Sequence, residues 1–216
     1  MMTSPCESLP AADCPFCPRI VALREEQRSL NPQWHNAPVA SFGRADARLL
    51  IVGLAPGLQG ANRTGRPFTG DYAGDLLYAT LLKFGFARGR YAARPDDGLV
   101  LADCRITNAV RCVPPQNKPI GAEIAACRSF LKSELAAMTK LSALLALGRI
   151  AHDSILGAVG QRRANHSFGH GTEHDLGGGL RLFDSYHCSR YTTNTGRLTA
   201  AMFEQVFSQI RNYLRA

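Results

Sequence analysis

The sequence predicts an α/β protein: a three-layer α/β/α sandwich around a four-stranded, mostly parallel sheet, in a single domain over residues 1–216. Two observations carry this prediction. Short apolar runs of strand length alternate four times with segments whose apolar residues recur at helical spacing, as in parallel strands joined by helical crossovers. In addition, a glycine-rich loop directly follows the first strand, at the end where open α/β sheets bind their ligands.

Size and charge narrow the class of protein. The chain has 216 residues, of which 45% are hydrophobic, so it can bury a core without disulfides. Its formal net charge of +8 favours a polyanionic partner such as nucleic acid, although a GC-rich genome would also enrich arginine. No apolar run is long enough to span a membrane, and the first residues do not resemble an export signal. We therefore expect no membrane partner and a cytoplasmic location.

The first half of the chain is predicted to contain two helices and one buried strand. Residues 19–30 read as a short, charged helix. Residues 48–52 are an apolar run between polar residues, which suits a parallel strand covered on both faces. After the glycine-rich loop, a helix over 73–84 carries four leucines on its core side.

The second half continues the alternation of strand and helix. The helix over 121–140 is predicted because apolar residues from Ile124 to Met138 recur at helical spacing. Residues 160–179 are polar and rich in glycine and histidine, and we expect a loop there near the substrate rather than a metal site. The remaining elements are strands at 104–110, 141–147 and 180–186 and helices at 149–158 and 197–214.

The loop over 53–71 is rich in glycine and proline, so its backbone follows a fixed, irregular path. It lacks the Gly-Lys-Ser/Thr of a P-loop and the Gly-x-Gly-x-x-Gly order of a dinucleotide fingerprint. It does place one aromatic residue, Phe68, close to one acid, Asp71. The loop therefore predicts a ligand site that is neither of those two kinds.

Two polar residues stand at the ends of other predicted strands. Asn108 lies near the end of a buried strand, where its amide must find partners, either inside the protein or on a ligand such as a pyrimidine edge. His187 follows the last strand, which places it at the same sheet edge as the loop 53–71 if the strands are parallel. Its alternative role is purely structural. The residues after His187 are small, polar and basic, which suits contacts with a phosphate backbone.

Four of the seven cysteines form a possible metal ligand set. Cys14 and Cys17 make a Cys-x-x-Cys pair, Cys112 stands in a loop, and Cys127 is on the following helix. Four thiolates match tetrahedral zinc or a [4Fe–4S] cluster, whereas Cys112 and Cys127 alone would also suit plain burial. The other three are not expected to bind metal: Cys6, Cys104 and Cys188.

Four motifs and the cysteine spacing together carry a family resemblance. The motifs are Gly-Leu-Ala-Pro-Gly at 53–57, the continuation at 62–71, Thr-Asn-Ala-Val-Arg-Cys-Val-Pro-Pro at 107–115, and Tyr-His-Cys-Ser-Arg at 186–190 with Thr-Gly-Arg-Leu-Thr at 195–199. They resemble the uracil-DNA glycosylase superfamily, most closely its family 5, the type-b enzymes. The cysteines resemble the cluster ligands of families 4 and 5.

The resemblance implies a cofactor, an activity and a partner. The cofactor is a structural [4Fe–4S] cluster, with zinc as the alternative. The activity is hydrolysis of the bond that joins uracil, and by analogy hypoxanthine or xanthine, to deoxyribose in DNA, as in base excision repair. The partner is double- or single-stranded DNA containing deaminated bases, bound by a monomer that acts at the nucleoid of a prokaryote.

The resemblance also assigns roles to residues. Phe68 stacks on the flipped base, Asn108 hydrogen-bonds the base edge, and His187 donates to the base O2, where negative charge grows as the bond breaks. The glycine-rich loop is expected to bind the substrate through Gly53, Leu54, Ala55 and Gly57. The stretch after the histidine is expected to bind DNA through Ser189, Arg190, Asn194 and Arg197.

The chain departs from the superfamily pattern in the first motif. Leu54 and Ala55 stand where most members carry a polar or acidic residue. The acid that positions the attacking water must therefore come from elsewhere, and we expect Asp71 in this role, with Asp75 as the second candidate. The alternative is that Asp71 only caps the following helix.

Two other functions fit parts of the sequence. A non-enzymatic DNA-binding module with a structural metal site of four cysteines would have no need of Asn108 or His187. A hydrolase of free nucleosides would have no need of the basic net charge.

Overall fold

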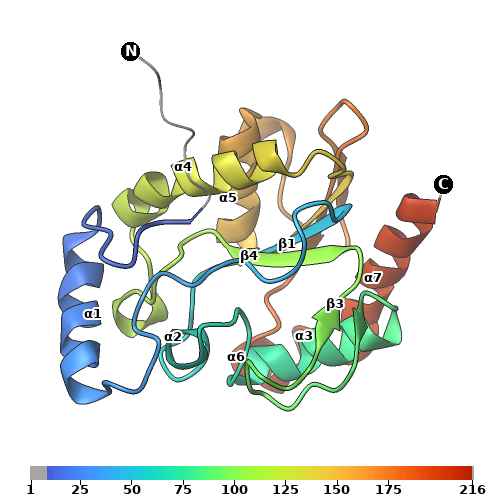
Figure 1. Cartoon of the computed structure of the whole chain (residues 1–216). Helices are drawn as coiled ribbons and strands as arrows, with labels where there is room; N and C mark the ends of the chain where they lie inside the picture. The colour runs from blue at the N-terminus through green and yellow to red at the C-terminus, as the bar shows by residue number, and fades with distance from the viewer. Residues whose placement is uncertain (1–8, 216) are drawn as a thin grey trace.

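The computed structural model describes residues 9–215 and contains a five-stranded central sheet with helices on both faces (Figure 1). Its strands are β1 (Leu49–Gly53), β4 (Cys104–Asn108), β5 (Ala143–Leu147), β6 (Glu173–Asp175) and β7 (Arg181–Ser185). The order across the sheet is β4-β1-β5-β7-β6. The first four run parallel, and β6 is antiparallel to β7. The carboxyl ends of four strands therefore meet at one edge.

The predicted α/β class is confirmed, but the predicted number of strands is wrong. The fifth strand, β6, lies inside the segment 160–179, which we expected to be a loop. It pairs with β7 at the sheet edge, where His174 stands opposite Leu182. A polar edge strand of three residues has neither the length nor the apolar pattern by which a strand is detected in a sequence.

Four helices form the two outer layers of the sandwich: α3 (Tyr72–Lys83) and α7 (Ala200–Arg215) on one face, and α4 (Gly121–Ala137) and α5 (Arg149–Val159) on the other. The remaining helices are α1 (Pro18–Leu30), α2 (Ala61–Thr64) and α6 (Arg190–Asn194). Side chains alternate between the two faces along β1, as the pleat of a strand requires. Leu49 and Ile51 join the core beneath α3 and α7, whereas Leu50 and Val52 join the core beneath α4 and α5.

Every long predicted element is present, with its ends displaced by a few residues. For example, β4 ends at Asn108 rather than at 110, and α4 ends at Ala137 rather than at 140. The short helices α2 and α6 were not predicted, because single turns carry no helical periodicity. The structure also has a small antiparallel pair of β2 (Ala87–Arg88) and β3 (Val100–Leu101), and 3₁₀ turns at Pro115–Asn117 and Arg163–Asn165.

Within residues 9–215, none of the helices combines the length and the apolar character that crossing a membrane requires.

Candidate active site

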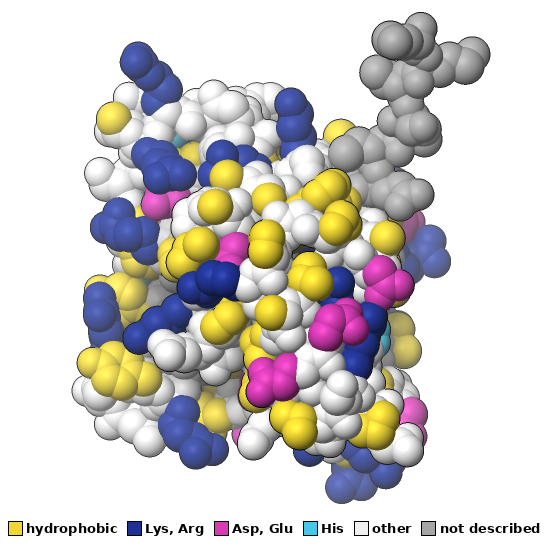
Figure 2. All heavy atoms as spheres, turned by 90° about the vertical axis from the view of Figure 1, so that its left-hand side faces the viewer, with side chains coloured by type: hydrophobic (Ala, Val, Ile, Leu, Met, Phe, Trp, Pro, Cys, Tyr) yellow, Lys and Arg dark blue, Asp and Glu magenta, His cyan; other side chains and the backbone are white. Residues whose placement is uncertain are grey.

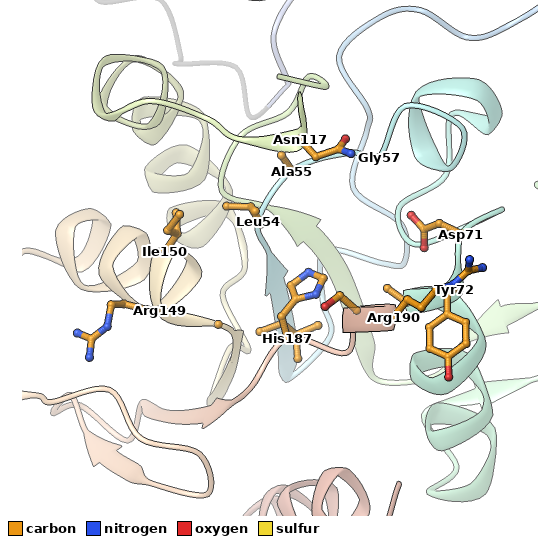
Figure 3. Close-up of a pocket in the computed structure, with 14 residues that line it drawn as sticks. Leu54, Ala55, Gly57, Asp71, Tyr72, Asn117, Arg149, Ile150, His187 and Arg190 are labelled. Carbon is orange, nitrogen blue, oxygen red and sulfur yellow. The ribbon is translucent and has the colours of Figure 1, made fainter. Parts of the chain in front are cut away.

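A cleft of about 560 Å³ opens where β1, β5 and β7 end (Figure 3). Leu54 follows β1, Gly148 follows β5 and His187 follows β7, while Asp71 lies at the start of α3. This is the sheet edge at which the sequence placed the site. Seven of the predicted site residues line the cleft: Leu54, Ala55, Gly57, Asp71, His187, Ser189 and Arg190.

A second, smaller pocket of about 30 Å³ shares part of its wall with the cleft. Phe68 and Asn108 line the pocket but not the cleft. The rings of Phe68 and His187 lie nearly parallel, with centroids 6.0 Å apart and an interplanar angle of 28°. The residues common to the pocket and the cleft are Ala55, Gly57, Asp71, Ala73 and His187. The predicted aromatic, amide, acid and imidazole groups therefore meet in one place.

The side-chain oxygen of Asn108 accepts no hydrogen bond from any of the described residues. The residue is 3% exposed, and its Oδ1 is buried without a hydrogen bond. Leaving such a group unpaired costs about 1–3 kcal/mol, so buried polar atoms without partners are uncommon. Gly53, which pairs with Asn108 across β1 and β4, has no Cβ that would fill the space in front of this oxygen. The orphaned acceptor therefore indicates a ligand that brings an N–H or O–H group.

Phe68 is held in an unfavourable backbone conformation. Its φ of 53° lies in the left-handed region, which costs a bulky residue about 1–3 kcal/mol. Two tyrosines hold the backbone here: the half-buried Tyr91 donates to the carbonyl of Phe68 at 3.2 Å, and the buried Tyr78 donates to the carbonyl of Pro67 at 2.6 Å. Strain that is supported in this way is common at functional sites. The Phe68 ring is thereby fixed at the wall of the pocket.

Asp71 both caps a helix and faces the cleft. Its Oδ1 accepts the backbone N–H of Gly74 at 3.2 Å, so it is the N-cap of α3. Its Oδ2 lies against Gly57 and Gly60, where a Cβ at Gly57 would come within 3.1 Å. Burial raises the pKa of Asp71 above its usual 3.8, against the lowering effect of the helix N–H groups. Asp75, the second candidate, is exposed in the first turn of α3 and lines neither the cleft nor the pocket.

His187 is neutral at physiological pH. Burial lowers its pKa to about 4, and its ring makes no hydrogen bond within the described part of the chain. A neutral imidazole carries one N–H donor and one acceptor. The backbone around His187 is tied down on both sides, because Thr192 donates to its carbonyl and the Cys188 thiol donates to the carbonyl of Ala73 at 3.4 Å. The imidazole is therefore positioned as a hydrogen-bond donor or acceptor toward a ligand.

The predicted DNA-binding residues lie along and beyond the mouth of the cleft. Ser189 caps α6, and the guanidinium of Arg190 lies 5.4 Å from the ring of Tyr72. Arg197 lies over Tyr186 at 4.6 Å and lines a neighbouring groove of about 430 Å³. Asn194, at the end of α6, is exposed and lines neither the cleft nor the groove.

Sequence reasoning missed seven of the fourteen residues that line the cleft, among them Asn117 and Arg149. Asn117 lines the cleft from the loop between β4 and α4, and both it and Gln116 have positive φ values, of 55° and 57°. Arg149 begins α5 and lines both the cleft and the neighbouring groove. Figure 3 shows Asn117 across the cleft from His187, and Arg149 pointing outward from it. Two consecutive non-glycine residues in the left-handed region are a sign of function that only coordinates reveal.

The four cysteines of the predicted metal set gather in a second place, away from the cleft. Cys14, Cys17, Cys112 and Cys127 line one small cavity between α1, the loop after β4, and α4. Burial raises the pKa of Cys17 to about 11 and that of Cys112 to about 12. Thiols with such pKa values stay protonated and unreactive unless a metal displaces the proton. Cys104 and Cys188 are buried elsewhere in the main core, and Cys6 lies outside the described residues.

Comparison with known families identifies the family to which the chain belongs. The family profile described as "Uracil DNA glycosylase superfamily" matches residues 40–211, which is most of the chain. The chain belongs to the uracil DNA glycosylase superfamily. The family membership predicted from the motifs is thus confirmed.

Within the uracil DNA glycosylase superfamily, this chain is similar to proteins named type-5 uracil-DNA glycosylase. It is 44% identical to that of Thermus thermophilus over 92% of each chain. It is 41% identical to that of Mycobacterium tuberculosis, over 92% of this chain and 77% of the relative. A type-4 uracil-DNA glycosylase of Thermotoga maritima is more distant, with 31% identity over 72% of each chain.

A buried ion pair lies behind the sheet edge that carries the cleft in this superfamily member. His152 Nε2 lies 2.9 Å from the carbonyl of His166, and its Nδ1 lies 2.8 Å from Asp184 Oδ1. Since both partners are acceptors, both ring nitrogens of His152 must carry protons. Asp184 also accepts from His174 Nε2 at 3.0 Å and from the N–H of Gly169 at 3.3 Å. The histidine-rich segment is therefore fastened to β7, three residues before His187.

This pair predicts a loss of stability as the pH rises. Burial alone would lower the pKa of His152, but the Asp184 carboxylate outweighs it and raises the pKa above 6.5. The pair therefore contributes its full stabilisation below the pKa of His152 in the unfolded chain. This stabilisation is lost as the pH rises through the pKa of His152 in the folded protein, and it amounts to about 1.4 kcal/mol for each unit by which the two pKa values differ. Because the buried His187 acts in the opposite sense, the test is a comparison: between about pH 6 and pH 8 the wild type should lose unfolding free energy in urea relative to Asp184→Asn. An equal pH dependence in both proteins would contradict the charged pair.

Proposed function

We propose that this protein is a monofunctional uracil-DNA glycosylase of base excision repair, which hydrolyses the bond between uracil and deoxyribose in DNA after the nucleotide has left the stack. The observation that carries the proposal is the orphaned Oδ1 of Asn108, buried in a pocket whose wall includes Phe68 and His187. The names of the type-5 relatives support the same substrate. We extend the proposal by analogy to hypoxanthine and xanthine.

Recognition of the base rests on Asn108 and Phe68. The N3–H of uracil can donate to Asn108 Oδ1, which has no donor among the described residues. The O4 of uracil can accept from the amide N–H₂ of the same side chain. Cytosine presents the opposite pattern at these two positions, so the amide in this orientation disfavours it. The fixed ring of Phe68 supplies a flat surface for the extruded base. Flipping costs a few kcal/mol, less for a mispaired uracil, and stacking against Phe68 offsets part of that cost.

Bond cleavage rests on His187 and Asp71. As the bond to the sugar breaks, negative charge grows on the base, and the neutral imidazole of His187 donates an N–H to O2. The sugar becomes electron-deficient, so water suffices as the nucleophile. Asp71 uses Oδ1 to cap α3, while Oδ2 orients the water and takes its proton. The two earlier interpretations of Asp71, as cap and as catalytic acid–base group, are compatible because they use different oxygens.

Contacts with DNA are assigned to the rim of the cleft. Arg149, Arg190 and Arg197 are exposed around its mouth, and each is steadied by an aromatic ring within 5.5 Å. Such arginines suit phosphate contacts, which carry most of the affinity for a nucleic acid. By contrast, basic and acidic side chains are mixed across the face that carries α1 (Figure 2). We propose that a monomer binds double- or single-stranded DNA with the cleft side, at the nucleoid of a prokaryote.

We propose that the four gathered cysteines hold a structural [4Fe–4S] cluster, with zinc as the alternative. Within residues 9–215, no three of their sulfurs lie within 4.8 Å of one another. Tetrahedral zinc would draw its thiolates to about 3.8 Å, given a Zn–S bond of about 2.3 Å, so the wider set fits a cluster better. The backbone N–H of Arg111 already donates to Cys127 Sγ at 3.3 Å. Such a group would fasten α1 to the loop after β4 and to α4.

The direct test is release of free uracil from a synthetic duplex by the purified, iron-loaded protein. We expect an abasic product from a uracil duplex and none from the matched thymine or cytosine duplex. Hypoxanthine and xanthine duplexes, run in parallel, define the range of bases. If loaded protein binds the uracil duplex and releases no base from any of these substrates, the enzyme is ruled out in favour of a DNA-binding module.

The close approach at Gly53 predicts a severe effect of the smallest possible substitution. In Gly53→Ala, the new Cβ would lie 2.5 Å from the Phe68 ring and closer still to Asn108 Oδ1, so both must move. We expect a loss of about 10²-fold in kcat/KM, because displacements near 1 Å have effects of that size. Gly121→Ala is the matched control, since nothing lies within 4 Å of its Cβ position. Equal steady-state activity of the two variants would contradict the assignment of this pocket as the base-binding site.

A further inference from the structure

One arginine is buried beside the four cysteines. Arg24, on α1, is 4% exposed and lines the same cavity as Cys14, Cys17, Cys112 and Cys127. A buried guanidinium is costly unless its charge and its donors are matched. Its partners therefore need to be accounted for.

The donors of Arg24 are only partly satisfied. Its Nη1 and Nη2 both donate to the carbonyl of Cys14, at 3.2 Å each. Its Nε–H is buried without a hydrogen bond among the described residues. The nearest carboxylate oxygen, Glu25 Oε1, lies 3.7 Å from Nε, beyond hydrogen-bond distance, and is already bonded by Arg28 at 3.1 Å. The Nε–H thus lacks a partner among the described residues, and the charge has only the 3.7 Å contact with the exposed Glu25.

The other two arginines near the cysteines do have matched charges. Arg19 pairs with the buried Glu123 at 3.0 Å. Arg111, whose backbone N–H bonds Cys127, pairs through its side chain with Glu134 at 2.5 Å. The Nε–H of Arg111 is likewise buried without a hydrogen bond, but Glu134 matches its charge. Arg24 has no carboxylate within hydrogen-bond distance among the described residues, and it lines the cavity in which four thiolates would stand.

We propose that Arg24 is the charge partner of the metal centre, offsetting the negative charge of the four cysteinates and donating its Nε–H to a sulfur of the bound group. The inference rests on the proposed cluster. A cluster with four thiolates carries net negative charge, and hydrogen bonds and nearby charges set both its hold on iron and its reduction potential. The contact with the Cys14 carbonyl keeps the guanidinium in place, which also positions the first ligand.

Three variants distinguish the effect of the positive charge of Arg24 from that of its hydrogen bonds to the Cys14 carbonyl. Arg24→Gln removes the charge and keeps an N–H₂ donor, whereas Arg24→Lys keeps the charge and loses the two-pronged bond to Cys14. Arg28→Gln is the matched control: it is one turn further along α1 and also bonds the N-terminal segment, at the carbonyl of Ala12, but it does not line the cavity. The measurement is the rate at which an iron chelator removes the visible absorbance of the loaded proteins, with iron content determined first.

We expect Arg24→Gln to lose its absorbance about tenfold faster than the wild type, as substitutions of residues that support metal ligands commonly do. Arg24→Lys and Arg28→Gln should stay within about threefold of the wild type. We also expect the equilibrium constant for one-electron reduction of the cluster to be tenfold smaller in Arg24→Gln, which lowers the reduction potential by about 59 mV.

Three other outcomes are decisive. Equal rates in Arg24→Gln and the wild type would overturn the proposal. If Arg24→Lys loses its absorbance as fast as Arg24→Gln, Arg24 acts as an anchor for Cys14 and its charge is not what stabilises the bound group. A wild type that binds zinc or no metal would reject the cluster itself, which distinguishes failure of the cofactor from failure of Arg24.

Discussion

Replacement of His187 by alanine is expected to slow uracil release by about 10²–10³-fold, the usual effect of removing one donor to a developing negative charge. The effect should fall on the chemical step, because the imidazole donates to the leaving base and makes no hydrogen bond within the described part of the chain. Its pKa of about 4 keeps the ring neutral in the working pH range, so no net charge is lost in the variant. Affinity for the uracil duplex should therefore change by less than about threefold.

Single-turnover release and duplex affinity, measured on the same preparations, check this prediction. His187→Gln, which retains an N–H donor on a more flexible side chain, should fall between the wild type and His187→Ala. His166→Ala is the control, since the ring of His166 packs against His174 but lines neither the cleft nor the pocket, and the backbone carbonyl that binds His152 is retained. Retention of more than a third of the wild-type rate by His187→Ala would remove the histidine from the mechanism.

Much of the site was predictable because it follows from strand ends. Gly53, Asn108 and His187 each stand at or just after the end of a buried strand, and parallel strands bring their ends to one edge. What the sequence alone could not tell is which strands are neighbours. In the order β4-β1-β5-β7, strand β1 lies between β4, which ends at Asn108, and β5, which ends just before Gly148. The loop that follows β1 therefore lies at the same edge as the end of β7, and the centroids of the Phe68 and His187 rings are 6.0 Å apart.

The rest of the site depends on irregular backbone, which periodicity does not report. Asn117 reaches the cleft only because two successive residues of its loop take positive φ values. The helix α6 is a single turn capped by Ser189, in a segment for which the sequence predicts no regular element. The charge state of His152 depends on a carbonyl 14 residues away in the chain. In each case a local contact, rather than a residue pattern, decides the structure.

Asp71→Asn is expected to lower kcat/KM by about 10²-fold or more while leaving the stability of the protein nearly unchanged. Asparagine is as good an N-cap as aspartate, so Oδ1 of the amide still accepts the N–H of Gly74. The lost function is that of the second oxygen, which can no longer take a proton from water. Asp71→Ala should lose activity to the same extent and, in addition, about 1 kcal/mol of unfolding free energy, because the cap is gone.

The pH dependence separates the two carboxylate roles further. In the wild type burial raises the pKa of Asp71 above 3.8 and lowers that of His187 to about 4, so acidification protonates both groups. Activity needs Asp71 ionised and His187 neutral, so kcat/KM should fall steeply toward low pH with the slope of two protons. In Asp71→Asn the residual activity should fall with the slope of one. A variant with wild-type activity, or with an unchanged two-proton limb, would leave Asp71 as a helix cap alone and move the search for the water-positioning group to Asn117, which faces the same cleft.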